Sequence, residues 1–233
     1  MTNPTTEGLR AWYRGVEAIV PELYNAGCAM CGSPALARET LHETLVGAWA
    51  EELTVGVGFR ETVRVMLRRE AARAVREAKV PGAAWPGLRP AGDEDALMAL
   101  AAREAPEAQR MILLRYGCGL SPRAIAPFLG CSAQEVRAVL ERFESRCRKQ
   151  LPERERRKAE QRIAREAHRA LALRAPDMPS KERVYRDFEA EAMSLARGVP
   201  RVSRILGRLL IALMALTCAA MFWLFAVLCA QTA

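Results

Sequence analysis

Two cysteines three residues apart, Cys28 and Cys31, have the spacing of a zinc knuckle, in which thiolates bind a tetrahedral zinc ion. His42 is a candidate third ligand, but no second cysteine pair follows and no fourth ligand is evident. The chain has seven cysteines, an odd number, and two of them lie in a long apolar stretch near its end. We therefore expect neither a zinc ion nor a disulfide framework, and we assign the cysteines to small apolar core positions.

Catalytic chemistry has few candidates in this sequence. His42 and His168 are the only histidines, and there is no glycine-rich phosphate loop and no nucleophile elbow. The carboxylates fall mostly at helical ion-pair spacing. We expect no catalytic residue, no cofactor and no metal site, so the chemistry to look for is recognition.

The segment from Ser121 to Leu140 has the pattern of a helix-turn-helix. Ser121 is placed to cap a first helix, Gly130 can adopt the positive φ of a tight turn, and Ser132 can cap a second helix with Glu135 as its capping-box partner. We expect five apolar side chains to face inward: Ile125, Ala126, Leu129, Val136 and Leu140. Such hairpins also occur in purely structural bundles, and Pro127 inside the first helix argues against a well-formed motif.

The second helix of this segment carries polar and basic side chains suited to DNA. Arginine and glutamine donate to base edges, and arginine and lysine bind phosphates. The candidate DNA-binding residues here are Ser132, Gln134, Arg137, Arg142 and Arg146, with Arg148 and Lys149 beyond them. Val139, Glu141 and Glu144 lie on the same helix, and a glutamate that faces phosphate opposes binding.

A second arginine-rich face is predicted on a helix that begins at Phe59. An apolar stripe marks its inner side, and the other side carries Arg64, Arg68, Arg69, Arg73 and Arg76. Glu61 and Glu70 are spaced to pair with these arginines, so composition alone favours a solvated charge stripe over a DNA surface.

The elements that must position these residues are helices. Alanine, arginine, glutamate and leucine dominate, and alternating β-branched runs are scarce, which predicts an all-α chain. We expect two small helical domains at 8–79 and 94–151, joined by a Pro- and Gly-rich linker at 80–93. A charged helical stalk follows at 152–208, and we expect it to begin as one long helix with intrahelical ion pairs.

Residues 209–230 form a stretch of 22 residues without a charge, long enough at about 1.5 Å per residue to cross a hydrocarbon core of about 30 Å. The alternative is a buried core helix, which would normally carry a polar stripe. Four arginines precede the stretch and none follows it, so the positive-inside rule places the N-terminal part in the cytoplasm. We expect a single-pass, tail-anchored protein with no signal peptide.

The net charge of +8 is uneven along the chain. Residues 1–80 are neutral, residues 81–151 carry +2, and residues 152–208 carry +6. Attraction to anionic lipid explains this distribution as well as attraction to nucleic acid does.

Over about residues 10–151 the sequence resembles an extracytoplasmic-function sigma factor, a small two-domain bacterial protein. EAQRMILLRYGCGLSPRAIAPFLGCSAQEVRAVLERFESRCRKQL resembles the C-terminal, promoter-reading domain of the family. Leu23-Tyr24, Gly32-Ser33-Pro34 and LARETLHETLVGAW resemble the first helices and the polymerase-binding helix, and FRETVRVMLRREAARAVRE resembles the promoter-melting helix.

The resemblance implies a partner for each domain. Leu41, Glu43 and Thr44 would lie on the face that binds core RNA polymerase. Four arginines of the melting helix would lie at promoter DNA: Arg68, Arg69, Arg73 and Arg76. The sequence departs from the family pattern at Arg38, His42 and Thr62, as well as at the recognition-helix positions named above.

Two hypotheses follow. The first is a membrane-tethered sigma-like protein that directs core RNA polymerase to promoters, restrained by an anti-sigma factor or by its tether until a protease cuts within 175–208. The alternative is a diverged sigma-like protein that binds polymerase or a regulatory partner at the membrane without specific promoter recognition. A membrane-anchored regulator with its own sensor ranks below both, because only three residues follow the predicted span.

Overall fold

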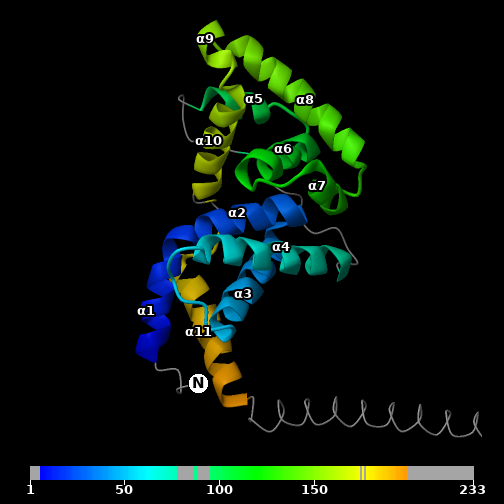
Figure 1. Ribbon diagram of the computed structural model, residues 1–233. Helices are drawn as coiled ribbons and strands as arrows, with labels where there is room; N and C mark the ends of the chain where they lie inside the picture. The colour runs from blue at the N-terminus through cyan, green and yellow to red at the C-terminus, as the bar shows by residue number, and fades with distance from the viewer. Residues whose placement is uncertain (1–5, 78–86, 89–94, 174, 176, 199–233) are drawn as a thin grey trace, which may run out of the picture. The chain divides into compact units, whose positions relative to one another are not determined.

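The computed structural model describes residues 6–77, 87–88, 95–173, 175 and 177–198. The described residues form helices and connecting turns, without a strand, which confirms the all-α prediction (Figure 1). Residues Thr5–Glu189 make one compact unit, and the described residues after Glu189 belong to a second unit. Both predicted helical domains therefore lie within a single compact unit.

The N-terminal part is a bundle of four helices: α1 (Thr6–Val16), α2 (Val20–Cys31), α3 (Pro34–Ala50) and α4 (Phe59–Glu77). A short 3-10 helix, η1 (Glu17–Ile19), joins α1 to α2. Helices α2, α3 and α4 pack against one another. Their buried side chains form the core of the bundle: Leu23, Tyr24, Leu41, Leu45, Val63 and Leu67. Gly32 ends α2 with a φ of 68°, and its N–H donates to the carbonyl of Cys28, which allows the chain to turn at once into α3.

The C-terminal part contains α5 (Ala96–Ala101), α6 (Pro106–Ile112), a π-helical turn η2 (Leu113–Gly117), α7 (Pro122–Leu129) and α8 (Ala133–Gln150). Its core is formed by Leu97, Met98, Ile112, Leu114, Ile125, Val136 and Phe143. Most of the predicted linker lies outside the described residues. Leu88, which is described, donates its N–H to Gln109 Oε1 at 2.7 Å, so the end of the linker is held against α6.

The predicted charged stalk differs from the structure in its described part. The long helix expected at the start of the stalk is divided into α9 (Glu153–Arg156) and α10 (Ala159–Ala172), and a separate helix α11 (Lys181–Gly198) follows. Helix α10 packs against α2, η2, α5 and α8, and it buries Ile163, Glu166, Ala167 and Leu171. The stripe was hard to see in the sequence because it includes two small alanines and a glutamate and lies between arginines and glutamates. The apolar side of α10 is therefore part of the core.

The predicted membrane span at 209–230 lies outside the described residues. Among the residues that are described, no helix combines the length and the apolar character needed to cross a membrane.

Candidate nucleic-acid interface

The α7–α8 unit has the local geometry that its sequence predicts. Ser121 caps α7 by accepting the N–H of Ala124, and Gly130 ends it with a φ of 64°. Ser132 Oγ accepts the N–H of Glu135 at 3.1 Å, and Glu135 Oε2 accepts the N–H of Ser132 at 2.6 Å, which completes a capping box. The backbone N–H of Ser132 lowers the pKa of the exposed Glu135 carboxyl. Both helix starts are thus set by contacts within three residues.

Most of the predicted inner face of this unit is buried. Ile125 and Val136 are fully buried and Leu140 nearly so, whereas Leu129 is only half-buried. Pro127 does not disrupt α7, because it lies on the exposed side. Pro127 lacks the N–H that would donate to the carbonyl of Arg123, and α7 nevertheless runs from Pro122 to Leu129.

The outer face of α8 exposes three of its five predicted DNA-binding residues without an acidic partner among the described residues. These are Gln134, Arg137 and Arg142. Arg137 Nε and Arg142 Nε donate only to helix carbonyls one turn back, those of Ala133 and Ala138, at 3.3 Å. The hydroxyl of Ser132 is committed to the helix cap, although the residue is exposed.

Three further charged residues of α8 have structural partners. Arg146 forms an ion pair with Glu104, which precedes α6. Glu144 accepts the hydroxyl of Tyr116 at 2.5 Å and Arg148 Nη2 at 2.8 Å. Burial and this hydrogen bond raise the pKa of the Tyr116 phenol. Glu144 is half-buried, and its charge is paired with that of Arg148. Of the two α8 glutamates that would oppose DNA binding, only Glu141 is exposed on this face.

The arginine face of α4 is more heavily paired. Arg73 lies 3.1 Å from Glu70 and 3.8 Å from Glu43, and Arg64 binds both Glu22 and Glu61. The four predicted residues differ in exposure. Arg69 and Arg76 are exposed, Arg68 is half-buried and donates to the carbonyl of Arg64, and Arg73 is exposed but held by its two glutamates.

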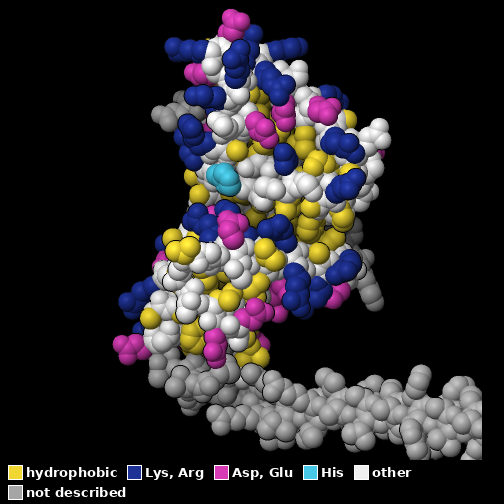
Figure 2. All heavy atoms as spheres, viewed as in Figure 1, with side chains coloured by type: hydrophobic (Ala, Val, Ile, Leu, Met, Phe, Trp, Pro, Cys, Tyr) yellow, Lys and Arg dark blue, Asp and Glu magenta, His cyan; other side chains and the backbone are white. Residues whose placement is uncertain are grey.

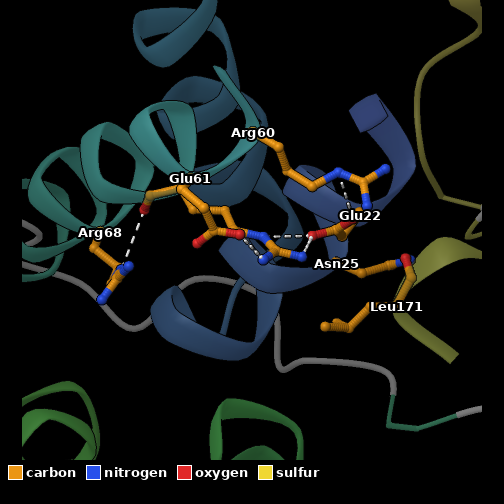
Figure 3. A network of polar contacts seen from close by, with 7 residues as sticks. Glu22, Asn25, Arg60, Glu61, Arg68 and Leu171 are labelled. Atoms are coloured by element: carbon orange, nitrogen blue, oxygen red, sulfur yellow. Dashed lines mark hydrogen bonds and ion pairs between the residues drawn. The ribbon is translucent and has the colours of Figure 1, made fainter. Parts of the chain in front are cut away.

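Glu22 of α2 is the residue that sequence reasoning missed on this face. Its Oε1 accepts Arg64 Nε at 2.7 Å and Nη2 at 2.5 Å, and Arg60 lies 3.9 Å from Oε2 (Figure 3). Burial acts against the charge on Arg64, but the hydrogen bonds and charges of Glu22 and Glu61 outweigh it, so the pKa of Arg64 is raised. No signal in the sequence links Glu22 to residues 38 or more positions later.

The predicted polymerase-binding set requires a correction. Leu41 and Thr44 are buried, because α3 turns them toward α2 and α4, and Thr44 Oγ1 donates to the carbonyl of Thr40 at 2.7 Å. Only Glu43 is exposed, and it pairs with Arg73. The outer side of α3 instead exposes Arg38 and Glu39 next to Glu43.

The cysteine pair shows no sign of a metal centre within the described part of the chain. Burial raises the pKa of Cys28 to about 12, which disfavours the thiolate that zinc requires, and Cys31 lies 3.6 Å from Thr40 Oγ1. No group of three or more candidate ligand side chains comes together among the described residues.

Charge on the visible surface is mixed rather than segregated. Lys and Arg side chains are interspersed with Asp and Glu on the face that Figure 2 draws. A DNA-binding role for this surface would therefore depend on a few unpaired arginines and not on one continuous basic area.

A scan against protein-family models found no match, and neither did searches of curated proteins and of solved structures.

Proposed function

We propose that this protein is a membrane-tethered, sigma-factor-like protein that directs core RNA polymerase to promoter DNA. The observation that carries the proposal is the α7–α8 unit, in which a glycine turn and two serine caps present Gln134, Arg137 and Arg142 on the outer side of the second helix. A helix presented in this way fits the major groove of B-DNA.

The exposed side chains of α8 suggest a division of roles. Gln134 lies in the first turn and Arg137 in the second, where a recognition helix meets base edges. Glutamine pairs with adenine and arginine with guanine. Arg142, further along the helix, suits a phosphate, as do Arg69 and Arg76 on α4. The resemblance of residues 59–77 to a promoter-melting helix supports a role for α4 at the second promoter element.

The tether is supported by the uncharged stretch 209–230 and by the arginines before it. The resemblance of residues 36–49 to a polymerase-binding helix supports core RNA polymerase as the protein partner. The exposed Arg38, Glu39 and Glu43 are the side chains on α3 that a partner can reach.

A second candidate function is binding of polymerase or another partner without promoter selection. The pairing of Arg64, Arg73 and Arg146 with glutamates favours it, because each paired arginine contributes less to phosphate binding.

The two functions separate in one experiment with the full chain in phospholipid nanodiscs. The protein is mixed with core RNA polymerase, and the complex selects DNA from a random promoter library. Selection of a two-part promoter supports initiation. Polymerase binding without selection supports the second function. No polymerase binding overturns the first function and leaves the second only with a partner other than polymerase. Arg137→Ala should change the selected sequence at one position, whereas Arg14→Ala, an exposed arginine on α1, should not.

A further inference from the structure

Three helix ends in the compact unit are capped by side chains from a different part of the chain. The first is the end of α2. Arg110 of α6 donates Nε to the carbonyl of Ala29 and Nη2 to that of Met30, both at 2.8 Å. These are among the carbonyls that lack a partner within the helix. Burial lowers the pKa of Arg110, but a guanidinium remains charged at neutral pH, so the cap is a strong one.

The second capped end belongs to α10. Asn25 of α2 donates Nδ2 to the carbonyl of Leu171 at 2.8 Å and to that of Leu173 at 2.6 Å. Figure 3 shows Asn25 extending from α2 toward Leu171. The N-terminal bundle is thus attached to the segment that follows the predicted helix-turn-helix part.

The third capped end is the start of α5. Glu166 of α10 is fully buried, and its Oε2 accepts the N–H groups of Leu97 and Met98 at 2.9 and 3.2 Å. Arg169, one turn further along α10, lies 2.9 Å from Asp95. A carboxylate at a helix N-terminus is favoured by the helix dipole, so α10 is firmly fixed on the C-terminal part.

Beyond α10 the chain returns to the N-terminal bundle through aromatic side chains. Phe188 of α11 is fully buried, and its ring stacks on Trp12 with 5.3 Å between centroids. The ring centroids of Tyr185 and Tyr13 lie 5.1 Å apart. At the rim, Lys181 Nζ lies 2.8 Å from Glu17 Oε1. Buried aromatic side chains surrounded by charged ones are typical of binding interfaces.

We propose that residues 159–189 are an intramolecular strap that holds the N-terminal bundle against the helix-turn-helix part in a closed, DNA-binding-impaired form. Helix α10 packs on both parts, and α11 extends the contact with the N-terminal bundle. The functional consequence rests on the proposed function, because it concerns access to the arginine face of α4. Since strap and target share one chain, their effective concentration is high, and a modest interface suffices to keep the form closed.

Closure brings the turn after η2 next to that arginine face. Cys118, directly after η2, is half-buried, and the charges of Arg64, Arg68 and Glu22 act on its thiol. The side chain of Arg64 is 20% exposed, and Arg68 is half-buried. Opening of the strap frees this region of α4.

The labelling rates of three cysteines can show whether the strap is open or closed in the full chain. Cys28 is buried next to Tyr24, whose hydroxyl contacts Asp177 Oδ2 at 3.1 Å, and Cys118 lies at the junction with α4. Cys147 is fully buried on the inner side of α8, within the C-terminal part. Opening exposes the buried Cys28, increases the exposure of the half-buried Cys118 and leaves Cys147 protected, whereas global unfolding exposes all three.

The test measures maleimide labelling of each cysteine by mass spectrometry, in the full chain in neutral-lipid nanodiscs. Phe188→Ala should speed labelling of Cys28 and Cys118 by about tenfold and leave Cys147 unchanged. Leu195→Ala, which removes an exposed apolar side chain from the same helix, is the matched control and should change none.

A rim variant keeps the proposal testable if Phe188→Ala unfolds the protein. Lys181→Glu places a carboxylate next to Glu17, so it should speed labelling of Cys28 and Cys118 by about two- to threefold, and adding Glu17→Lys should restore the original rate. Equal labelling of all three cysteines in both strap variants, or no acceleration in either, overturns the strap.

The strap and the proposed function can fail separately. The labelling test needs neither DNA nor polymerase. If the strap variants open and also bind promoter DNA with polymerase more tightly, both stand. If they open without any gain in binding, the strap stands but does not impair DNA binding, and the proposed function is decided separately by promoter selection.

Discussion

Helices α4 and α8 both carry an arginine-rich outer side, yet their arginines are in different states. On α8, Arg137 and Arg142 contact only their own helix backbone among the described residues. On α4, Arg64 and Arg73 are held by glutamates from their own helix and from α2 and α3. The number of arginines therefore says little about DNA binding, and the acidic neighbours decide which of them are free for phosphate or bases.

The largest expected effect tests the structural role of the α4 arginines. Glu22→Ala leaves the mostly buried guanidinium of Arg64 with only its exposed partner Glu61. We expect a loss of about 3 kcal/mol in the free energy of unfolding, measured by urea denaturation. Glu61→Ala removes the exposed partner of the same arginine and should cost about 0.5 kcal/mol or less. Equal effects of the two substitutions would contradict the assignment of Arg64 to the fold.

The second effect contrasts the two helices in DNA binding. Arg137→Ala on α8 should weaken binding to a selected promoter by about 1–3 kcal/mol, roughly 5- to 150-fold, and relax the preference at one position. Arg73→Ala on α4 should weaken it less than about threefold, because Arg73 is already paired with Glu43 and Glu70. Titrations at two salt concentrations measure both. A larger loss for Arg73→Ala would reverse the comparison.

A smaller effect concerns the start of α8. Ser132→Ala removes the side-chain acceptor for the N–H of Glu135 and should cost about 1 kcal/mol of stability, seen as a lower urea midpoint. Ser145→Ala, an exposed serine in the interior of the same helix, should be near neutral. A cost as large for Ser145→Ala would show that the cap is not the cause.

The smallest effect is the pH dependence of the same cap. The pKa of Glu135 is lowered in the folded chain, so its contribution is fully present above the usual value of 4.5 and is lost as the pH falls through the folded-state pKa. The difference in urea midpoint between the native chain and Glu135→Gln should therefore shrink from pH 7 to pH 3. A difference that grows on acidification would mean that the carboxylate does not stabilise the cap.

Local features were readable from the sequence because their causes are local. The caps at Ser121 and Ser132 and the turn at Gly130 depend on residues within a few positions. The burial of Val63 and Leu67 on α4 follows from helical periodicity. Pro127 misled the prediction, because α7 has only eight residues and its caps at Ser121 and Gly130 hold it although one backbone hydrogen bond is missing.

Leu41 and Thr44 show what the resemblance could not predict. The resemblance places them on one functional face, and they do share one side of α3, but that side packs against α2 and α4. A helical pattern shows which residues share a side. It does not tell which neighbour covers that side.

The sequence by itself determined the helical class, the places where α7 and α8 begin, and the apolar stripe of α4, because propensity, capping and periodicity act over a few residues. Only the tertiary structure decided that Glu22 neutralises Arg64, that Asn25 caps α10, and that Phe188 stacks on Trp12. Each of these pairs joins residues far apart in the chain. Many side chains of the same type could have served as partners, and packing of the whole core selects one of them.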